Sequence, residues 1–377
     1  MSNLIIKFND TFNITNNIIN NNQEQINILR SAKRYYSTDP QYSKTWTNHN
    51  HQNLLCLAHI TDVHSDQTRF QRYVDFLNQV DMIDAGIDTG DRFDDPTDLE
   101  LEAMKPSNFP CNKEIYYAVG NHDMAGFTTR ITLTKLYNIL GRNTNTGKLY
   151  YYVDFNKPQS NIRLICLNQY NTDKQGADFI YTQEQIDWFI NILKDAKNKD
   201  LSVLVAMHGT ESNTIPNDKP FYNEYCQTEG IGSDYRTDTT RMIIEDIVEA
   251  WKHGTSLNKQ YSFLGINYTV NEDFSGTGNF IAFILGHSHI DRIGYSEHYS
   301  DLLQLRCSCG VLTTTIGYRK DNTYDTESDI PRIVNTPSED LFNLYIFDTY
   351  HKVVKVIRIG ATYNDMLEPR KYAIYNY

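Results

Sequence analysis

The chain has 377 residues, a formal net charge of −12 and 40% hydrophobic residues. This length and composition exclude disorder throughout the chain, because there is enough apolar surface for a large core. The acidic balance disfavours a protein that coats nucleic acid, since such binding depends on a basic surface. Phosphate chemistry in a pocket is not excluded, because bound divalent cations can dominate the local charge there.

Neither a secretion signal nor a membrane span is recognisable in the sequence. The N-terminus lacks a basic region followed by a long apolar stretch, and no segment approaches the roughly 18 apolar residues of a membrane span. We therefore expect a protein of the cytoplasm or of a non-secreted assembly. The six cysteines are dispersed apart from Cys307 and Cys309. No second Cys pair or nearby His completes a zinc set with these two, so alternating strand positions explain them more simply.

Residues 1–50 are rich in Asn, Gln, Ser and Thr, which indicates an N-terminal arm or linker. Within it, residues 26–36 (INILRSAKRYY) can form one short helix. The arm can dock on its own domain or on another chain, and the sequence does not choose between these. We expect the main domain over residues 51–360 and a C-terminal tail over residues 361–377.

From residue 54 the chain alternates between strand-like and helical patterns. The apolar run 54–60, the helical pattern 69–80 and the strand-like segment 82–91 predict a β-α-β unit. A strand follows in 114–123, then a helix over 128–140 and strands in 149–155 and 162–169. This alternation predicts a layered α/β fold.

The second half continues the alternation with one long interruption. Thr182 followed by Gln185 is a capping-box signature that opens a helix over residues 182–197, and residues 201–210 form the next strand. Residues 211–278 are polar, with one clear helix at 241–254, and we interpret them as an insertion over the functional site. Strands follow at 302–311 and 341–360, the latter turning as a hairpin at residues 348–352.

Five polar clusters stand at the ends of predicted strands: Asp62-Val63-His64, Gly90-Asp91, Gly120-Asn121-His122-Asp123, His208 and Gly286-His287-Ser288-His289. In an open α/β sheet, loops at the carboxyl ends of neighbouring strands meet in one crevice. Because strand side chains alternate, an Asp-x-His or His-x-His pair directs both side chains the same way. Carboxylate with imidazole suits Mn, Fe or Zn, and one carboxylate can bridge two ions.

Each cluster alone is weak, because a lone Asp-x-His arises by chance and an isolated Gly-Asp is usually a turn. The ordered set is different, since five of the 11 histidines fall inside it and each follows a strand-like run. The set therefore predicts a site for two divalent metal ions, with Asp91 as the natural bridge.

In this order the clusters resemble the calcineurin-like metallophosphoesterase superfamily, whose pattern is Asp-x-His, Gly-Asp, Gly-Asn-His-Asp/Glu, His and Gly-His-x-His. The match spans roughly residues 54 to 292. The resemblance implies a four-layer α/β/β/α sandwich of two mixed sheets with helices outside. It also implies a ligand assignment, with Asp91 bridging the ions and His122 above them without ligating: Asp62, His64 and His289 for the first metal, and Asn121, His208 and His287 for the second.

The expected reaction is hydrolysis of a phosphate ester, with a phosphodiester favoured, by a hydroxide that bridges the two metals. His122 would protonate or stabilise the leaving oxygen, and Asp94 would orient its ring. The alternative for Asp94 is a solvated turn residue, while Asp123 is expected to brace the local loop. Candidate phosphate contacts are Arg92 and Arg130, although an exposed Arg is usually only a solvated surface residue.

Other functions stay open at this stage. The protein Ser/Thr phosphatase branch has the pattern Gly-Asp-x-x-Asp-Arg-Gly, whereas this chain has Asp94-Asp95-Pro96 at the corresponding place. The Arg that binds phosphate in that branch is therefore missing, and protein dephosphorylation is disfavoured. A nuclease would need a local groove, which Arg69, Arg72 and Arg92 are candidates to form, and nucleic acid is expected only as a substrate. The third possibility is an assembly component that keeps the fold as a platform, although the chain keeps every expected metal ligand.

Overall fold

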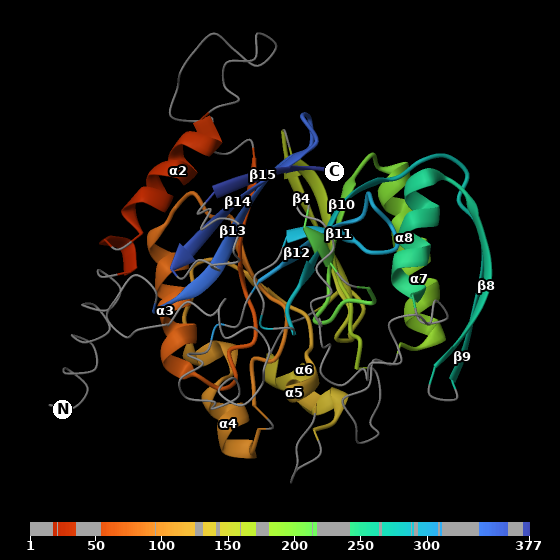
Figure 1. The fold of residues 1–377 in the computed structure, drawn as a ribbon. Helices are drawn as coiled ribbons and strands as arrows, with labels where there is room; N and C mark the ends of the chain where they lie inside the picture. Colours follow the sequence, from red (N-terminus) through yellow and green to blue (C-terminus); the bar gives the residue numbers. More distant parts are fainter. Residues whose placement is uncertain are drawn as a thin grey trace, which may run out of the picture.

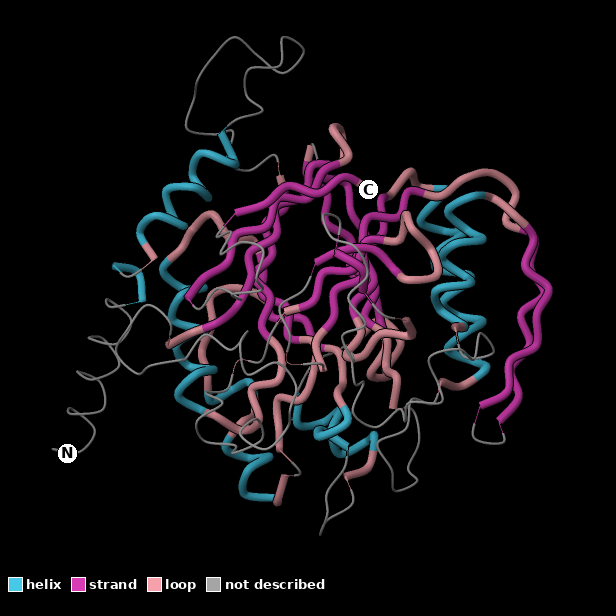
Figure 2. The backbone as a smooth tube through the Cα atoms, viewed as in Figure 1, coloured by secondary structure: helices cyan, strands magenta, loops and turns pink. Residues whose placement is uncertain are grey.

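The computed structural model describes residues 18–20, 22–34, 54–94, 96–124, 131–140, 144–158, 160–170, 181–212, 214–216, 242–263, 266–287, 289, 293–307, 310, 339–360 and 372–377. Two β-sheets lie face to face between outer layers of helices (Figures 1 and 2). No helix in these described ranges is both long and apolar enough to cross a membrane.

The first sheet is mixed, in the order β15-β14-β13-β1-β2-β3. Strands β1, β2 and β3 run parallel to one another. On the other side of β1, each neighbouring pair is antiparallel: β1 with β13, β13 with β14, and β14 with β15. The predicted hairpin at residues 348–352 is confirmed, since Asp348 pairs with Val353. The strands are β1 (Leu55–Ile60), β2 (Ala85–Asp88), β3 (Ile115–Tyr117), β13 (Leu341–Asp348), β14 (Val353–Gly360) and β15 (Tyr372–Asn376).

The second sheet is also mixed, in the order β4-β5-β6-β10-β12-β11-β7. Its four central strands β5, β6, β10 and β12 run parallel, so their carboxyl ends lie at one edge. The strands are β4 (Tyr151–Lys157), β5 (Ser160–Cys166), β6 (Ser202–Ala206), β7 (Thr214–Pro216), β10 (Asn279–Leu285), β11 (Ile293–Ser296) and β12 (Leu303–Arg306).

Three apolar cores separate the four layers, as expected when each sheet buries both faces. The inner core joins the facing sheets through residues such as Leu57, Ile87 and Ile284. The outer cores pack helices on the far side of each sheet. The predicted four-layer α/β/β/α sandwich is therefore confirmed. The first sheet carries α2 (Gln23–Arg34) and α3 (Gln67–Gln79), and the second carries α7 (Gln183–Asn198) and α8 (Ile243–His253).

Helix α7 is capped by a local hydrogen bond and held in place by a tertiary one. Thr182 caps the helix by accepting a hydrogen bond from the backbone N–H of Gln185, as predicted. The Gln185 side chain does not complete the capping box. It turns instead to the backbone of Asn168, donating to its carbonyl at 2.9 Å, so it ties α7 to the segment after β5. The shorter helices are α4 (Asp98–Ala103), a 3-10 turn (Pro106–Asn108), α5 (Asn121–Met124) and α6 (Leu133–Leu140).

Both chain ends contribute to the first sheet. Part of the predicted arm packs on this chain itself, because Ile18, Ile26 and Leu29 are buried in the outer core and Asn22 Oδ1 accepts a hydrogen bond of 2.9 Å from the Gly360 backbone N–H. The region predicted as a C-terminal tail contains β15, the edge strand of the sheet.

The segment predicted as an insertion contains a hairpin that the sequence analysis missed, formed by β8 (Ser256–Phe263) and β9 (Ile266–Asp273). Its buried residues Tyr261, Tyr268 and Val270 join the core around α7 and α8. The hairpin therefore covers the outer side of these helices (Figure 1), and this part of the insertion does not lie over the functional site. Residues 217–241 of the insertion lie outside the described residues.

Candidate metal centre

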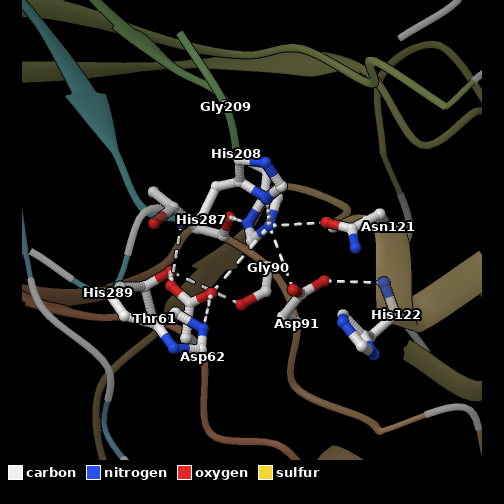
Figure 3. A network of polar contacts seen from close by, with 12 residues as sticks. Thr61, Asp62, Gly90, Asp91, Asn121, His122, His208, Gly209, His287 and His289 are labelled. Atoms are coloured by element: carbon white, nitrogen blue, oxygen red, sulfur yellow. Dashed lines mark hydrogen bonds and ion pairs between the residues drawn. The ribbon is translucent and has the colours of Figure 1, made fainter. Parts of the chain in front are cut away.

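The predicted ligand residues converge at the carboxyl ends of strands from both sheets (Figure 3). The loops after β1 and β2 are held together by their backbones, since Asp62 N–H donates to Gly90 O and His64 N–H donates to Asp91 O, both at 2.9 Å. Sharp turns aim the side chains inward. Five of these residues have positive φ angles between 47° and 68°, a strained conformation that clusters at functional sites: Asp62, His64, Asp91, His287 and His289.

Glycine at position 120 lets two of these loops approach closely. A Cβ atom at Gly120 would lie 2.1 Å from Asp91 Oδ1 and 2.3 Å from the Asp91 backbone nitrogen. Any side chain would therefore displace the carboxylate that stands at the middle of the site.

The first group of ligand atoms comes from Asp62, His64 and His289, which lie within 4.8 Å of one another. His289 Nε2 lies 3.1 Å from both His64 Nε2 and Asp62 Oδ1. The other oxygen of Asp62 is occupied, because Oδ2 accepts hydrogen bonds from Thr61 Oγ1 at 2.7 Å and His287 N–H at 2.9 Å. Among the described residues, Oδ1 accepts no hydrogen bond although it is buried, and it lies 3.1 Å from His289 Nε2 and 4.0 Å from His208 Nε2.

The second group comes from Asp91, His208 and His287, again within 4.8 Å. His208 Nε2 lies 3.1 Å from Asp91 Oδ2, 3.1 Å from Asn121 Oδ1 and 3.2 Å from His287 Nδ1. His208 Nδ1 lies 2.8 Å from the Thr89 carbonyl, which can only accept, so Nδ1 carries a proton and Nε2 is directed to the site. Although burial lowers it, Asp91 raises the pKa of His208 to about 9, so Nε2 is also protonated while no metal ion is bound. Asp62 Oδ1 is 4.0 Å from His208 Nε2, so the two groups adjoin.

This donor set fits two divalent cations. Two pairs of imidazole nitrogens face each other at hydrogen-bond distance, where neutral rings would oppose lone pairs unless a cation or proton stood between them. Burial alone would raise the pKa of Asp91, but His208 lowers it to about 2, and the His289 imidazole likewise holds the pKa of Asp62 well below its usual range despite burial. Burial lowers the pKa of His287 to about 4, and the charge on His208 contributes to this shift. Two buried carboxylates that stay ionised, together with imidazole nitrogens, form a donor set for hard to borderline metal ions.

Comparison with known proteins identifies the family of this chain. The chain matches the family described as calcineurin-like phosphoesterase over residues 57–291. The chain belongs to this family. Calcineurin-like phosphoesterases are metal-dependent hydrolases of phosphoesters, and this function follows from membership. A search among curated proteins found no match.

Solved structures similar to this calcineurin-like phosphoesterase share little of its sequence. A dimetal phosphatase from Danio rerio is 11% identical, with 86% of this chain and 99% of that chain covered and a TM-score of 0.48. The phosphopantetheinyl hydrolase of Mycobacterium tuberculosis is 12% identical, with 72% and 95% covered and a TM-score of 0.37. A 5'-nucleotidase from Candida albicans is 12% identical, with 85% and 51% covered and a TM-score of 0.36.

Beside the two ligand groups, His122 and Asp94 form a pair at the solvent side. His122 Nδ1 lies 3.1 Å from Asp94 Oδ1, and His64 Nδ1 lies 3.5 Å from the same oxygen. The contact with His122 holds the pKa of Asp94 well below its ordinary value, so the carboxylate is ionised. The His122 side chain is 30% exposed and therefore reachable by a substrate.

Asp123 lies behind the site and binds the backbone of its loops. Its Oδ2 accepts hydrogen bonds from the backbone N–H groups of Gly120 at 2.7 Å and Asp91 at 3.1 Å, and its Oδ1 accepts one from Phe93 at 3.0 Å. These three contacts are the loop brace that the sequence analysis expected of this residue.

Arg92 and Arg130 were the candidate phosphate contacts. Arg92 is 2% exposed, and its guanidinium carbon stacks 3.8 Å from the Phe70 ring centre and 4.5 Å from that of Tyr117. This position in the outer core gives no support to a phosphate contact. Arg130, the other candidate, lies outside the described residues.

The three arginines considered for a nuclease groove do not form one, because their guanidinium groups are buried as well. Arg69 and Arg72 are buried and form ion pairs with Glu339 and Asp340 just before β13. With Arg92 also buried, these guanidinium groups stabilise the packing of α3 and do not line a surface. The local sequence around an arginine does not reveal its ion-pair partner when that acidic residue lies far away in the chain.

Proposed function

We propose that this calcineurin-like phosphoesterase hydrolyses a phosphodiester at a binuclear manganese centre. The observation that carries the proposal is the pair of adjoining ligand groups, one around Asp62 and one around His208, with Asp91 between them. Asp62, His64 and His289 would hold one ion, Asn121, His208 and His287 the other, and Asp91 both. Two divalent ions bound there would polarise the phosphoryl oxygens and would lower the pKa of the attacking water.

The chain's own residues supply the proton for the leaving group. An ester oxygen leaves more readily when it is protonated, and His122 is a partly exposed imidazole beside the ligand groups. Asp94 holds Nδ1 of this ring, so a protonated His122 would donate from Nε2. The backbone N–H of His122 donates to Asp91 Oδ1 at 2.8 Å, which fixes the distance between proton donor and metal centre.

The test compares a diester with a monoester. Protein freed of metal with a chelator would be assayed on bis-p-nitrophenyl phosphate and p-nitrophenyl phosphate before and after addition of Mn²⁺. We expect no turnover without metal, turnover with Mn²⁺, and a higher kcat/KM on the diester.

Two variants give the control. Asp91→Asn removes the central carboxylate charge and should abolish turnover, whereas Asp187→Asn removes an exposed carboxylate on α7 and should leave turnover unchanged. Equal loss in both variants, or Mn²⁺-independent turnover, would refute the proposal. Faster turnover of the monoester would refute only the diester preference.

A further inference from the structure

A buried polar chain runs from the first sheet toward the metal centre, and it begins at His59 on β1. His59 is fully buried; its Nδ1 lies 3.0 Å from the hydroxyl of Tyr345 on β13, and its Nε2 lies 2.8 Å from Thr89 Oγ1. Burial lowers the pKa of His59 to about 3 although Asp62 opposes this, so the ring is neutral. A neutral imidazole has one donor and one acceptor, and the two hydroxyls satisfy both.

Thr89 connects this histidine to the candidate ligands. Its side chain contacts His59, while its carbonyl contacts His208 Nδ1 at 2.8 Å. Its own N–H donates to Ile60 O at 3.2 Å. Thr89 is fully buried between the end of β2 and the turn at Gly90 and Asp91.

The Thr89 carbonyl decides how His208 meets a metal. Because the carbonyl accepts the Nδ1 proton, Nε2 is directed toward Asp91 Oδ2 and Asn121 Oδ1, each 3.1 Å away, where a bound metal would take the place of the Nε2 proton. Partners of this kind fix the tautomer and the ring orientation of metal-binding histidines. A shift of the Thr89 peptide would therefore move the donor atom of His208.

We propose that His59 is a positioning residue of the metal centre, acting through Thr89 on His208. The inference rests on the proposed function, because it takes His208 as a metal ligand. His59 does not touch the metal or the substrate. It fixes the Thr89 side chain, and thereby the carbonyl that orients His208.

The experiment is a Mn²⁺ titration followed by electron paramagnetic resonance, which distinguishes isolated from exchange-coupled ions. His59→Phe keeps a flat ring and removes both nitrogen atoms, while Thr89→Val removes the hydroxyl with nearly the same shape. Losing the direct hydrogen-bond partner of a metal ligand weakens metal binding about 10- to 100-fold. Both variants keep the Thr89 carbonyl and lose only what fixes it, so we expect one of the two Mn²⁺ ions to bind about 10-fold more weakly, at the lower end of this range, with the other ion unchanged. The double variant should show little further loss, because both changes break one linkage.

Ser160→Ala serves as the matched control. Its buried hydroxyl links β1 to β13, accepting from Leu55 N–H at 3.0 Å and donating to Phe347 O, without touching Thr89. This variant should lose stability and keep the wild-type affinity for both ions.

The outcomes separate the two proposals. Wild-type protein that binds two ions, together with His59→Phe and Thr89→Val variants that bind both equally well, would overturn the positioning role alone. A loss of affinity in Ser160→Ala as large as in the other variants would also overturn it. Wild-type protein that binds no pair of ions would overturn the proposed function and this inference together. If His59→Phe does not fold, Thr89→Val decides.

Discussion

Replacing Asp123 with alanine should destabilise the protein and loosen its metal centre together. The carboxylate is 4% exposed and accepts three backbone hydrogen bonds, from Asp91, Gly120 and Phe93. In Asp123→Ala these N–H groups keep their burial and lose their acceptor. The Asp91 backbone would then be free to shift, and its side chain with it.

The magnitude follows from the donors that lose their acceptor. A buried N–H group left without a partner costs about 1 to 3 kcal/mol. Burial and the nearby Asp91 raise the pKa of Asp123 to about 6 although its backbone hydrogen bonds oppose this, so removing the charge offsets part of the loss. We expect a net loss of about 3 kcal/mol in the free energy of unfolding.

Urea unfolding of the metal-free protein measures this loss, and a Mn²⁺ titration measures the effect on the site. Asp94→Ala is the matched control, because Asp94 belongs to the same loop but its side chain is 46% exposed. Asp94→Ala should unfold near the wild-type urea concentration. An unchanged midpoint for Asp123→Ala, or an equal loss in both variants, would refute the bracing role.

Three further predictions concern the site and the second sheet. Asp94→Asn should lower kcat about 100-fold on diesters with alkyl leaving groups and much less with p-nitrophenolate, because only the poor leaving group needs the proton of His122; an equal loss on both would contradict this role. Gly120→Ala should bind far less Mn²⁺ after dialysis, since its Cβ would overlap Asp91, and wild-type metal content in this variant would contradict the close approach. Burial raises the pKa of Glu245 on α8 from 4.5 to about 7, despite hydrogen bonds from Ser296 and Ser212. Because the folded state binds the Glu245 proton more tightly than the unfolded state, the contribution of this group to the free energy of unfolding is complete below pH 4.5 and is lost as the pH rises through 7. Glu245→Gln should therefore raise the urea midpoint at pH 8 and lose this advantage below pH 5; a gain that is independent of pH would count against this cause.

Several elements of the fold could be predicted from short stretches of the sequence. The β-α-β unit from β1 to β2, helix α8 and the β13–β14 hairpin follow from short periodic runs and turns. The candidate metal ligands were recognisable because each cluster follows a strand, and parallel strands bring such ends to one edge of a sheet. The structure adds that these side chains lie together.

The features that could not be predicted depend on contacts between residues far apart in the sequence. The β8–β9 hairpin buries Tyr268 and Val270 against helices, yet its mostly polar sequence resembles a loop. Arg72 resembles a surface cation until Asp340, far along the chain, pairs with it. His59 belongs to an apolar run, so nothing in the sequence marks it as the partner of Thr89.

Seven residues are proposed to hold two divalent ions, and anomalous diffraction from crystals soaked in Mn²⁺ tests this most directly. We expect two peaks, one bound by Asp62, His64 and His289 and one by Asn121, His208 and His287, with Asp91 bound to both. A single peak, no peak, or two ions bound without Asp91 would contradict it.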